Sequence, residues 1–214
     1  MAATLPKPTR LTLSQIIDAA IGLIHRDGFD ALSMRKLAQQ CDVGVMTLYG
    51  HVRTKEELLT AIAERFFSEL RVPNRRLGWQ QQLKEIFRSV HRVFVEHPEL
   101  AQIVARQHIN TTAAFRGAEL AFAAMHQAGL DAEDAMSAFI ALTAFTAGFA
   151  QRQMNLERQP AIAARRLAML RELPASEFQH VSQLATLFVR GPTERDFETG
   201  LDFLIRGIAS KVRA

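Results

Sequence analysis

The side chains best suited to recognition chemistry gather in the first quarter of the chain. Thr47, Tyr49 and His51 fall on outward positions of a short predicted helix. Arg35 and Lys55 stand near the starts of the neighbouring predicted helices and add positive charge on the same side. Hydroxyl, imidazole and cationic groups are typical of side chains that contact phosphates and base edges. The pattern therefore predicts a surface that binds nucleic acid.

Patterns for catalysis or metal binding are incomplete. Glu177 and His180 have the spacing of one half of a di-iron carboxylate motif, but the chain contains no second Glu-x-x-His to complete the cage. A glycine-rich phosphate loop, a nucleophile elbow and a zinc-ligand spacing are also missing. None of the 7 histidines pairs with another at ligand spacing. The sequence predicts neither an enzyme nor a bound metal or cofactor.

The composition is that of a soluble, helical protein. The 214 residues are 48% hydrophobic and 22% charged, with only 11 Gly and 7 Pro, which leaves few turn residues for a many-stranded sheet. The single cysteine, Cys41, cannot form an internal disulfide and suits a reducing compartment such as the cytoplasm. The longest uncharged run, 135–151, is short and contains polar residues, so it indicates a buried helix and no membrane span.

Charge is distributed unevenly along the chain. The net charge is +4, from 26 basic and 22 acidic residues. Residues 1–55 hold 7 basic and 4 acidic side chains, and the remainder is nearly balanced. A basic first quarter is compatible with an anionic partner such as nucleic acid, although the excess alone decides nothing.

Apolar periodicity and capping signals predict an all-α protein. Capping boxes are expected at Thr12 with Gln15 and at Thr54 with Glu57, and Ser176 is expected to cap a later helix. The predicted helices cover approximately 12–28, 33–40, 45–52, 54–70, 79–96, 99–108, 111–128, 132–157, 161–172, 176–189 and 193–212.

The pattern divides the chain into three parts. Residues 1–53 form a small three-helix domain, 54–71 a connecting helix, and 72–214 a larger helical domain, with the boundary in an aperiodic stretch that contains Pro73 and Gly78. Two short helices joined by a four-residue turn behind a longer helix have the geometry of a helix-turn-helix unit. The expected core of this unit consists of Ile17, Ala20, Ile24, Leu37, Ala38, Val43 and Leu48. Small helical domains that bind nothing share such features, so periodicity alone leaves both interpretations open.

Residues 33–59, SMRKLAQQCDVGVMTLYGHVRTKEELL, resemble the signature of tetracycline-repressor (TetR) family transcription regulators. The resemblance includes the Leu-Tyr-x-His stretch and the lysine that opens the next helix. It implies a homodimeric, ligand-responsive and usually repressing protein that binds double-stranded DNA at a palindromic operator. The positions that match the family's DNA contacts are Arg35, Val45, Met46, Thr47, Tyr49, His51 and Lys55.

This chain departs from the family pattern at two positions. Asp42 replaces the usual turn glycine, and aspartate tolerates the left-handed backbone better than most residues. Gly44 replaces the usual serine cap, which removes a side-chain phosphate contact. Val45 and Met46 are apolar, so base readout there is expected through thymine methyl groups.

The C-terminal part resembles the regulatory domain of the same family, through Trp79, His97-Pro98 and the 128–130 turn among others. The resemblance implies that 132–157 and 194–212 pack against their copies in a dimer. It also implies a cavity between these helices and 79–128. The expected lining consists of Phe87, Val90, Phe94, Ile103, Val104, Gln107, Phe122, Met125, Phe139, Thr143 and Phe145.

Such a lining predicts an apolar or aromatic effector. Val104 and Gln107 stand where the drug-chelate-binding member of the family has a metal-ligating histidine and a threonine, so no magnesium-tetracycline chelate is expected. The alternative function is a helical ligand-binding or architectural protein without regulatory DNA binding.

Overall fold

The computed structural model describes residues 11–106, 110–157 and 160–212, and this part of the chain contains helices and no strands. The helices are α1 (Leu13–Asp27), the 3-10 helix η1 (Phe29–Ala31), α2 (Met34–Gln40), α3 (Val45–Tyr49), α4 (Lys55–Phe67), α5 (Trp79–Glu96), α6 (Pro98–Arg106), α7 (Thr112–Gln127), α8 (Ala132–Glu157), α9 (Pro160–Arg171), α10 (Gln179–Gln183), α11 (Ala185–Arg190) and α12 (Glu194–Ala209). The all-α prediction is confirmed.

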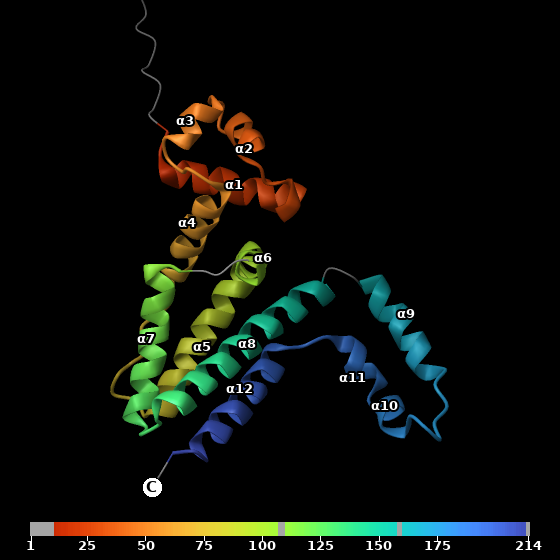
Figure 1. The fold of residues 1–214 in the computed structure, drawn as a ribbon. Helices are drawn as coiled ribbons and strands as arrows, with labels where there is room; N and C mark the ends of the chain where they lie inside the picture. Colours follow the sequence, from red (N-terminus) through yellow and green to blue (C-terminus); the bar gives the residue numbers. More distant parts are fainter. Residues whose placement is uncertain (1–10, 107–109, 158–159, 213–214) are drawn as a thin grey trace, which may run out of the picture.

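The first three α-helices form a small domain above the rest of the molecule, and α4 runs from it into the larger helical body (Figure 1). Of the seven predicted core residues, six are buried, and Val43 is partly buried against them. Leu37 and Leu48 are fully buried between α1 and the two short helices. The core therefore fixes α2 and α3 against the longer α1.

Helix ends follow the capping signals in part. Thr12 and Gln15 form the predicted capping box of α1. At α4, Thr54 accepts from the Glu57 backbone, but the Glu57 carboxylate accepts from the backbone N–H of Arg53 at 2.6 Å, so the expected reciprocal bond shifts by one residue.

The predicted helix over 176–189 is wrong in two respects. The chain forms two short helices, α10 and α11, that meet at Leu184, and Ser176 lies outside both. No residue of α10 is buried, and Ala185 is the buried residue of α11. Because little apolar surface anchors this stretch, packing does not enforce one continuous helix.

The body is organised around α5, which packs against α7, α8 and α12 (Figure 1). Its core includes Leu83, Phe87, Met125 and Phe197, all essentially inaccessible to solvent. Helix α12 approaches α8 closely at Gly200, where an added Cβ would lie 2.6 Å from the Phe145 ring. Among the described residues, no helix has the length and apolar character needed to cross a membrane.

Charged pairs also hold α12 to α5. Arg88 donates two hydrogen bonds to the Glu198 carboxylate, at 2.6 and 2.5 Å, and Lys84 pairs with Asp202 at 2.5 Å. The bidentate geometry fixes the relative rotation of the two helices as well as their separation. Helices α9 to α11 lie beyond the end of α8, to one side of the bundle (Figure 1).

Candidate DNA-binding and ligand-binding sites

The predicted DNA-contact residues occupy one small region but differ in exposure. Met46 is 80% exposed and Tyr49 40%, and Thr47 and Arg35 are also exposed. These side chains project from α3 and from the first turn of the adjacent α2. The exposed part of this surface combines a cation, hydroxyl groups and one long apolar side chain, which are suited to phosphate and base-edge contact.

Two other predicted contacts are partly withdrawn from the surface. Val45 is partly buried and packs against the core of the small domain, and His51 is also partly buried. Val45 therefore contributes to anchoring α3, while its neighbour Met46 projects into solvent. Of these two successive apolar residues, Val45 therefore packs against the core and only Met46 is available at the surface.

The turn before α3 depends on the backbone of Asp42. This residue has φ of +52°, and it is the one non-glycine residue with positive φ in the described chain. The turn is closed by a hydrogen bond from the Val43 N–H to the Ala38 carbonyl at 3.0 Å. Gly44 then starts α3 with no side-chain cap. Both departures from the family pattern are accommodated in this turn.

Cys41 ends α2 in the same turn and is partly buried. Burial raises the pKa of its thiol, because the apolar surroundings disfavour the charged thiolate. A raised pKa keeps the nucleophilic form scarce at neutral pH, so the thiol is a packing group.

Lys55 connects α4 to the small domain. Its Nζ donates to the Leu32 carbonyl at 2.8 Å and lies 5.3 Å from the centroid of the Phe29 ring. The ammonium group is thus engaged within the protein, in contacts that the sequence pattern did not predict. A lysine in this position stabilises the junction between the small domain and the first turn of α4.

An apolar cavity of about 170 Å³ lies among α4, α5, α6, α7 and α8. Of the predicted lining, Phe87, Val90, Phe94, Val104, Phe139 and Thr143 border it. The Thr143 hydroxyl donates to the Phe139 carbonyl at 2.7 Å, so its polar group is already satisfied within α8. The cavity therefore presents an almost entirely apolar wall.

Four described residues of the predicted lining do not border this cavity. Ile103 and Met125 are fully buried in packed core, because their helical faces meet neighbouring helices closely. Phe122 packs behind Phe139, with ring centroids 4.9 Å apart. Phe145 turns toward α12 and stacks on Phe197. The remaining residue of the predicted lining, Gln107, lies outside the described residues.

Seven further residues line the cavity that the sequence pattern did not predict. Phe67 and Leu70 come from the end of α4 and the residues that follow it, and Ile86 and Ala147 from α5 and α8. A further stripe from α7 consists of Ala114, Gly117 and Ala118. The spacing of this stripe, three small residues on one helical face, is the signal that could have identified that wall.

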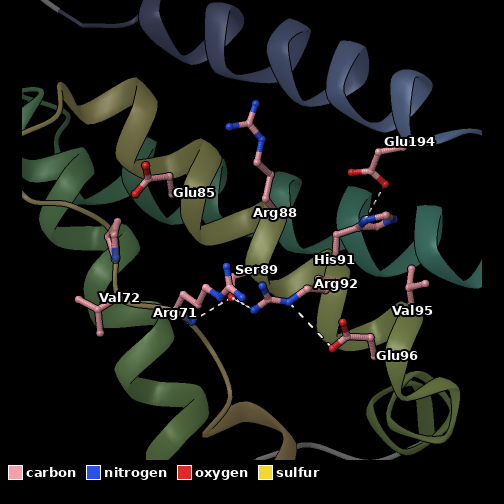
Figure 2. A pocket seen from close by; sticks show the side chains of 11 residues that line it. Arg71, Val72, Glu85, Arg88, Ser89, His91, Arg92, Val95, Glu96 and Glu194 are labelled. Carbon is pink, nitrogen blue, oxygen red and sulfur yellow. Dashed lines mark hydrogen bonds and ion pairs between the residues drawn. The ribbon is translucent and has the colours of Figure 1, made fainter.

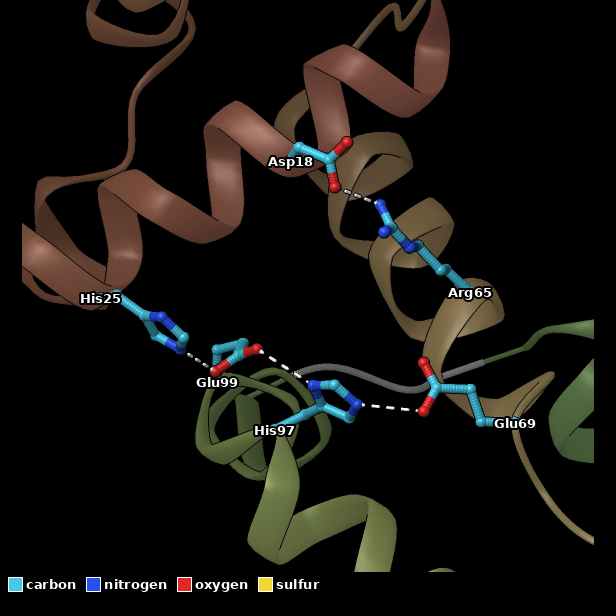
Figure 3. A network of polar contacts seen from close by, with 6 residues as sticks. All are labelled: Asp18, His25, Arg65, Glu69, His97 and Glu99. Atoms are coloured by element: carbon cyan, nitrogen blue, oxygen red, sulfur yellow. Dashed lines mark hydrogen bonds and ion pairs between the residues drawn. The ribbon is translucent and has the colours of Figure 1, made fainter.

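Side-chain contacts join the small domain to the body near the start of α6 (Figure 3). The His25 imidazole of α1 lies 2.6 Å from a carboxylate oxygen of Glu99, whose side chain is 1% exposed. Asp18 of α1 pairs with Arg65 of α4 at 2.5 Å. His97 stacks on Phe66 with centroids 4.0 Å apart. Movement of α4 or α6 therefore reaches the small domain through direct contacts.

A second, polar cleft of about 680 Å³ lies between α5, the segment after α4 and the start of α12 (Figure 2). Its wall carries three arginines and three glutamates, namely Arg71, Arg88, Arg92, Glu85, Glu96 and Glu194. The charges balance, so the cleft does not favour one sign of ligand. Burial lowers the pKa of His91 in its wall, although Glu194, 3.6 Å away, acts in the opposite direction.

The outer face of α8 and α12 is apolar and exposed. Ile140 and Phe203 are 58% and 68% exposed, and a shallow groove between the two helices is lined by residues of both. Of the small residues of α8, Ala135 and Ala138 are buried in the body core. Ala141, Ala144 and Gly148 do lie on the exposed face.

Comparison with known proteins identifies relatives over nearly the whole chain. The family model for bacterial regulatory proteins of the tetR family matches residues 16–62. The model for the tetracyclin repressor-like C-terminal domain matches residues 72–212.

Individual relatives agree with these matches. An HTH-type transcriptional regulator of Saccharopolyspora erythraea is 29% identical over 203 residues, which cover 94% of this chain and 85% of the relative. The HTH-type transcriptional repressor DrrR1 of Streptomyces coeruleorubidus is 28% identical over 213 residues, covering 95% and 78%. The crystal structure of the TetR family protein ActR of Streptomyces coelicolor in complex with actinorhodin has a TM-score of 0.84, with 31% identity and coverage of 96% and 100%.

Proposed function

The chain belongs to the TetR family of bacterial transcription regulators, and we propose that it is a homodimeric repressor released from its operator by a small, largely apolar effector. The observation that carries the proposal is the apolar cavity bordered by Phe67 and Leu70. These residues belong to the same connecting segment that begins at Lys55, against the small domain. Such a regulator acts on chromosomal DNA in the cytoplasm.

The proposed DNA surface is formed by α2 and α3. Arg35, Thr47 and Tyr49 are assigned to phosphate and polar base contacts, because their side chains are exposed. Met46 is assigned to thymine methyl groups, since its thioether side chain is 80% exposed. Val45, His51 and Lys55 complete the proposed set through the family pattern, with part of each side chain withdrawn into protein contacts.

The size of the cavity supports an effector-driven conformational change. Its volume of about 170 Å³ is smaller than the roughly 300–1,000 Å³ of sites that hold drug-sized ligands. An effector that exceeds this volume and enters fully displaces wall residues, and Phe67 and Leu70 on the α4 side move with the connecting segment. An effector that binds the widened state better shifts the population away from the DNA-binding state. ActR, whose structure was determined with actinorhodin, supports control by a small molecule.

The dimer is proposed to form through α8 and α12. Ile140 and Phe203 are more than half exposed, and Ala141, Ala144 and Gly148 give the same face a flat surface that permits close approach. A two-fold dimer presents its two α3 helices to DNA half-sites about 34–36 Å apart. Phe203→Glu places a charge in this face, and we expect it to produce monomers in sedimentation analysis and to abolish tight operator binding.

The DNA-binding proposal is tested by fluorescence anisotropy with DNA from upstream of the protein's own gene. We expect specific, salt-sensitive binding, and Tyr49→Ala should weaken it by about 1–3 kcal/mol. Arg35→Ala should weaken binding and reduce the salt slope by about 1. Phe115→Ala, which alters another exposed aromatic residue on α7, is the control. Absence of specific binding by the wild-type chain favours the alternative helical ligand-binding or architectural protein.

The effector proposal is tested by a thermal-shift screen of apolar and aromatic compounds. A compound that raises the unfolding temperature should also release the protein from its operator, because both effects come from binding one state preferentially. A compound that binds in the cavity and leaves operator affinity unchanged contradicts the proposed coupling.

A further inference from the structure

His97 lies between two carboxylates at the junction of α5 and α6 (Figure 3). Its Nε2 is 3.1 Å from Glu69, and its Nδ1 is 3.8 Å from Oε1 of Glu99. A neutral imidazole has one N–H and can donate to only one of them. The Glu99 side chain is 1% exposed, and its Oε1 finds no hydrogen-bond partner among the described residues. The arrangement thus leaves one buried acceptor unsatisfied, which normally has an explanation.

A third ligand group, the Glu96 carboxylate, lies close to Glu69 and His97. Donor atoms of Glu69, Glu96 and His97 lie within 4.8 Å of one another. The glutamate side chains are 43% and 54% exposed, so they can adjust and the site is open to solvent. Donor atoms of a tetrahedral zinc site are about 3.3 Å apart, from metal–ligand distances near 2.0–2.2 Å. Small rotations of two surface glutamates reach that geometry.

We propose that Glu69, Glu96 and His97 form a binding site for a divalent transition metal such as Zn²⁺. Imidazole nitrogen and carboxylate oxygens are ligands that zinc accepts, and three protein ligands leave a fourth position for water. The metal takes the Nε2 lone pair, so the imidazole proton resides on Nδ1 and faces Glu99 Oε1. The unsatisfied oxygen then faces a donor across 3.8 Å, and a small shift of the His97 ring on metal binding brings the two within hydrogen-bond range, as in the carboxylate–histidine–metal arrangement that orients ligating histidines.

The surrounding charges are compatible with this site. Arg92 pairs with Glu96 at 4.0 Å and also donates to the Ser89 hydroxyl at 3.4 Å, so it retains a partner when Glu96 turns to the metal. The other Glu99 oxygen keeps its 2.6 Å contact with His25. A site with one histidine escapes a sequence test based on paired histidines, which explains why no metal was predicted.

The position of the site implies a structural effect of the metal. Glu69 lies just after α4, whereas Glu96 and His97 lie where α5 ends. A shared ion therefore cross-links the connecting segment to the body. Ligands that bind only the folded state stabilise it, so Zn²⁺ should raise the unfolding temperature. The inference does not depend on the proposed regulatory function, and its test requires neither DNA nor effector.

The test uses the full, untagged chain after removal of metals with a chelator. Zn²⁺ is titrated by calorimetry and by competition with a chromogenic chelator, and one ion is expected per chain. Glu96→Gln and His97→Gln should each weaken binding by at least about tenfold, and Glu99→Gln by about 10–100-fold. Glu96 is exposed, so its amide variant preserves folding even where His97→Gln does not, and circular dichroism checks this.

Two further measurements distinguish the site from adventitious surface binding. The imidazole nitrogen resonances of His97 should report the Nδ1–H tautomer when Zn²⁺ is added. His180→Gln removes an exposed histidine three residues after Glu177 in the sequence and should leave zinc affinity unchanged. Zinc affinity that is unaffected by Glu96→Gln, or is lost in His180→Gln, overturns the proposal. Failure of the wild-type chain to bind zinc at micromolar concentration also overturns it.

Discussion

The small N-terminal domain and the helical body have cores of similar apolar side chains. The core of the small domain is closely packed, whereas the core of the body leaves a cavity. In the small domain, Leu37 and Leu48 are fully enclosed, and the candidate functional groups are on the outside. In the body, Phe87, Val90 and Phe94 meet a wall of small residues on α7, and a cavity remains. Function is therefore expected on the surface of the first region and in the interior of the second.

The largest expected difference between the regions is in the response to truncation. Leu48→Ala should lower the free energy of unfolding by about 2–5 kcal/mol, because it opens a cavity in a closed core. Val90→Ala should lower it by less than about 2 kcal/mol, since its side chain already borders free space. Urea denaturation measures both variants. Equal losses would show that the two regions are equally well packed.

Filling the cavity should separate ligand response from DNA binding. Ala118→Leu extends a side chain into the cavity and should weaken effector binding by at least about tenfold, or 1.4 kcal/mol, while operator binding persists. Ala123→Leu, on the exposed side of the same helix, is the matched control. Calorimetry with the effector and anisotropy with the operator give the two readouts. An effector response that survives Ala118→Leu would move the binding site elsewhere.

Backbone conformation provides a smaller test in the DNA-binding region. Asp42→Ala should destabilise the protein by about 1–2 kcal/mol, because alanine is disfavoured at φ of +52°. Asp42→Gly relieves the steric demand but increases the freedom of the unfolded chain, so its stability should remain within about 1 kcal/mol of wild type. Thermal unfolding of the two variants measures the difference. A destabilisation shared by both would indicate a role for the carboxylate itself.

The smallest effect concerns the two helix caps that resemble each other most. The α1 box uses Gln15, whereas the α12 box uses Asp196. Hydrogen bonds from Thr193, with a contribution from Arg190, lower the pKa of the Asp196 carboxyl. Its stabilising effect is therefore present above its unfolded-state pKa and is lost as pH falls through the lower folded-state pKa.

Asp196→Asn should consequently reduce the unfolding temperature slightly near neutral pH and have no effect in strong acid. The control is Gln15→Ala in α1, whose effect should not vary with pH over that range, since glutamine does not titrate. A difference between wild type and Asp196→Asn that persists at the lowest pH would contradict the electrostatic explanation.

Periodicity was sufficient for most helices, including α5 over Trp79–Glu96, which buries a continuous apolar face. It failed at α10 and α11, where little surface is buried. It also did not predict η1, whose three residues are too few to show a period. A buried apolar face therefore makes a helical pattern easier to recognise, and short or exposed segments are the ones whose bounds the pattern gives wrongly.

The cavity was only partly predictable for a related reason. A pattern shows which side chains face inward, but Met125 and Phe139 face inward alike, and only Phe139 borders free space. The distinction depends on the size of the opposing residue, such as Gly117 on α7. A search for bulky residues consequently misses the small ones that create the space. The exposed positions of α3 could be predicted from local sequence alone, because they depend on one short helix and the turn before it.

Because α4 is long, a small rotation at its cavity end produces a larger displacement at its other end, beside the small domain. Its 13 residues span about 20 Å, from Lys55 beside the small domain to Phe67 at the cavity. A rigid rod of that length that pivots by about 5° at one end displaces the other by about 2 Å. Hydrogen bonds to DNA do not survive a displacement of that size. The orientation of α4 at the cavity therefore determines how accurately the proposed DNA surface of α2 and α3 is positioned at its other end.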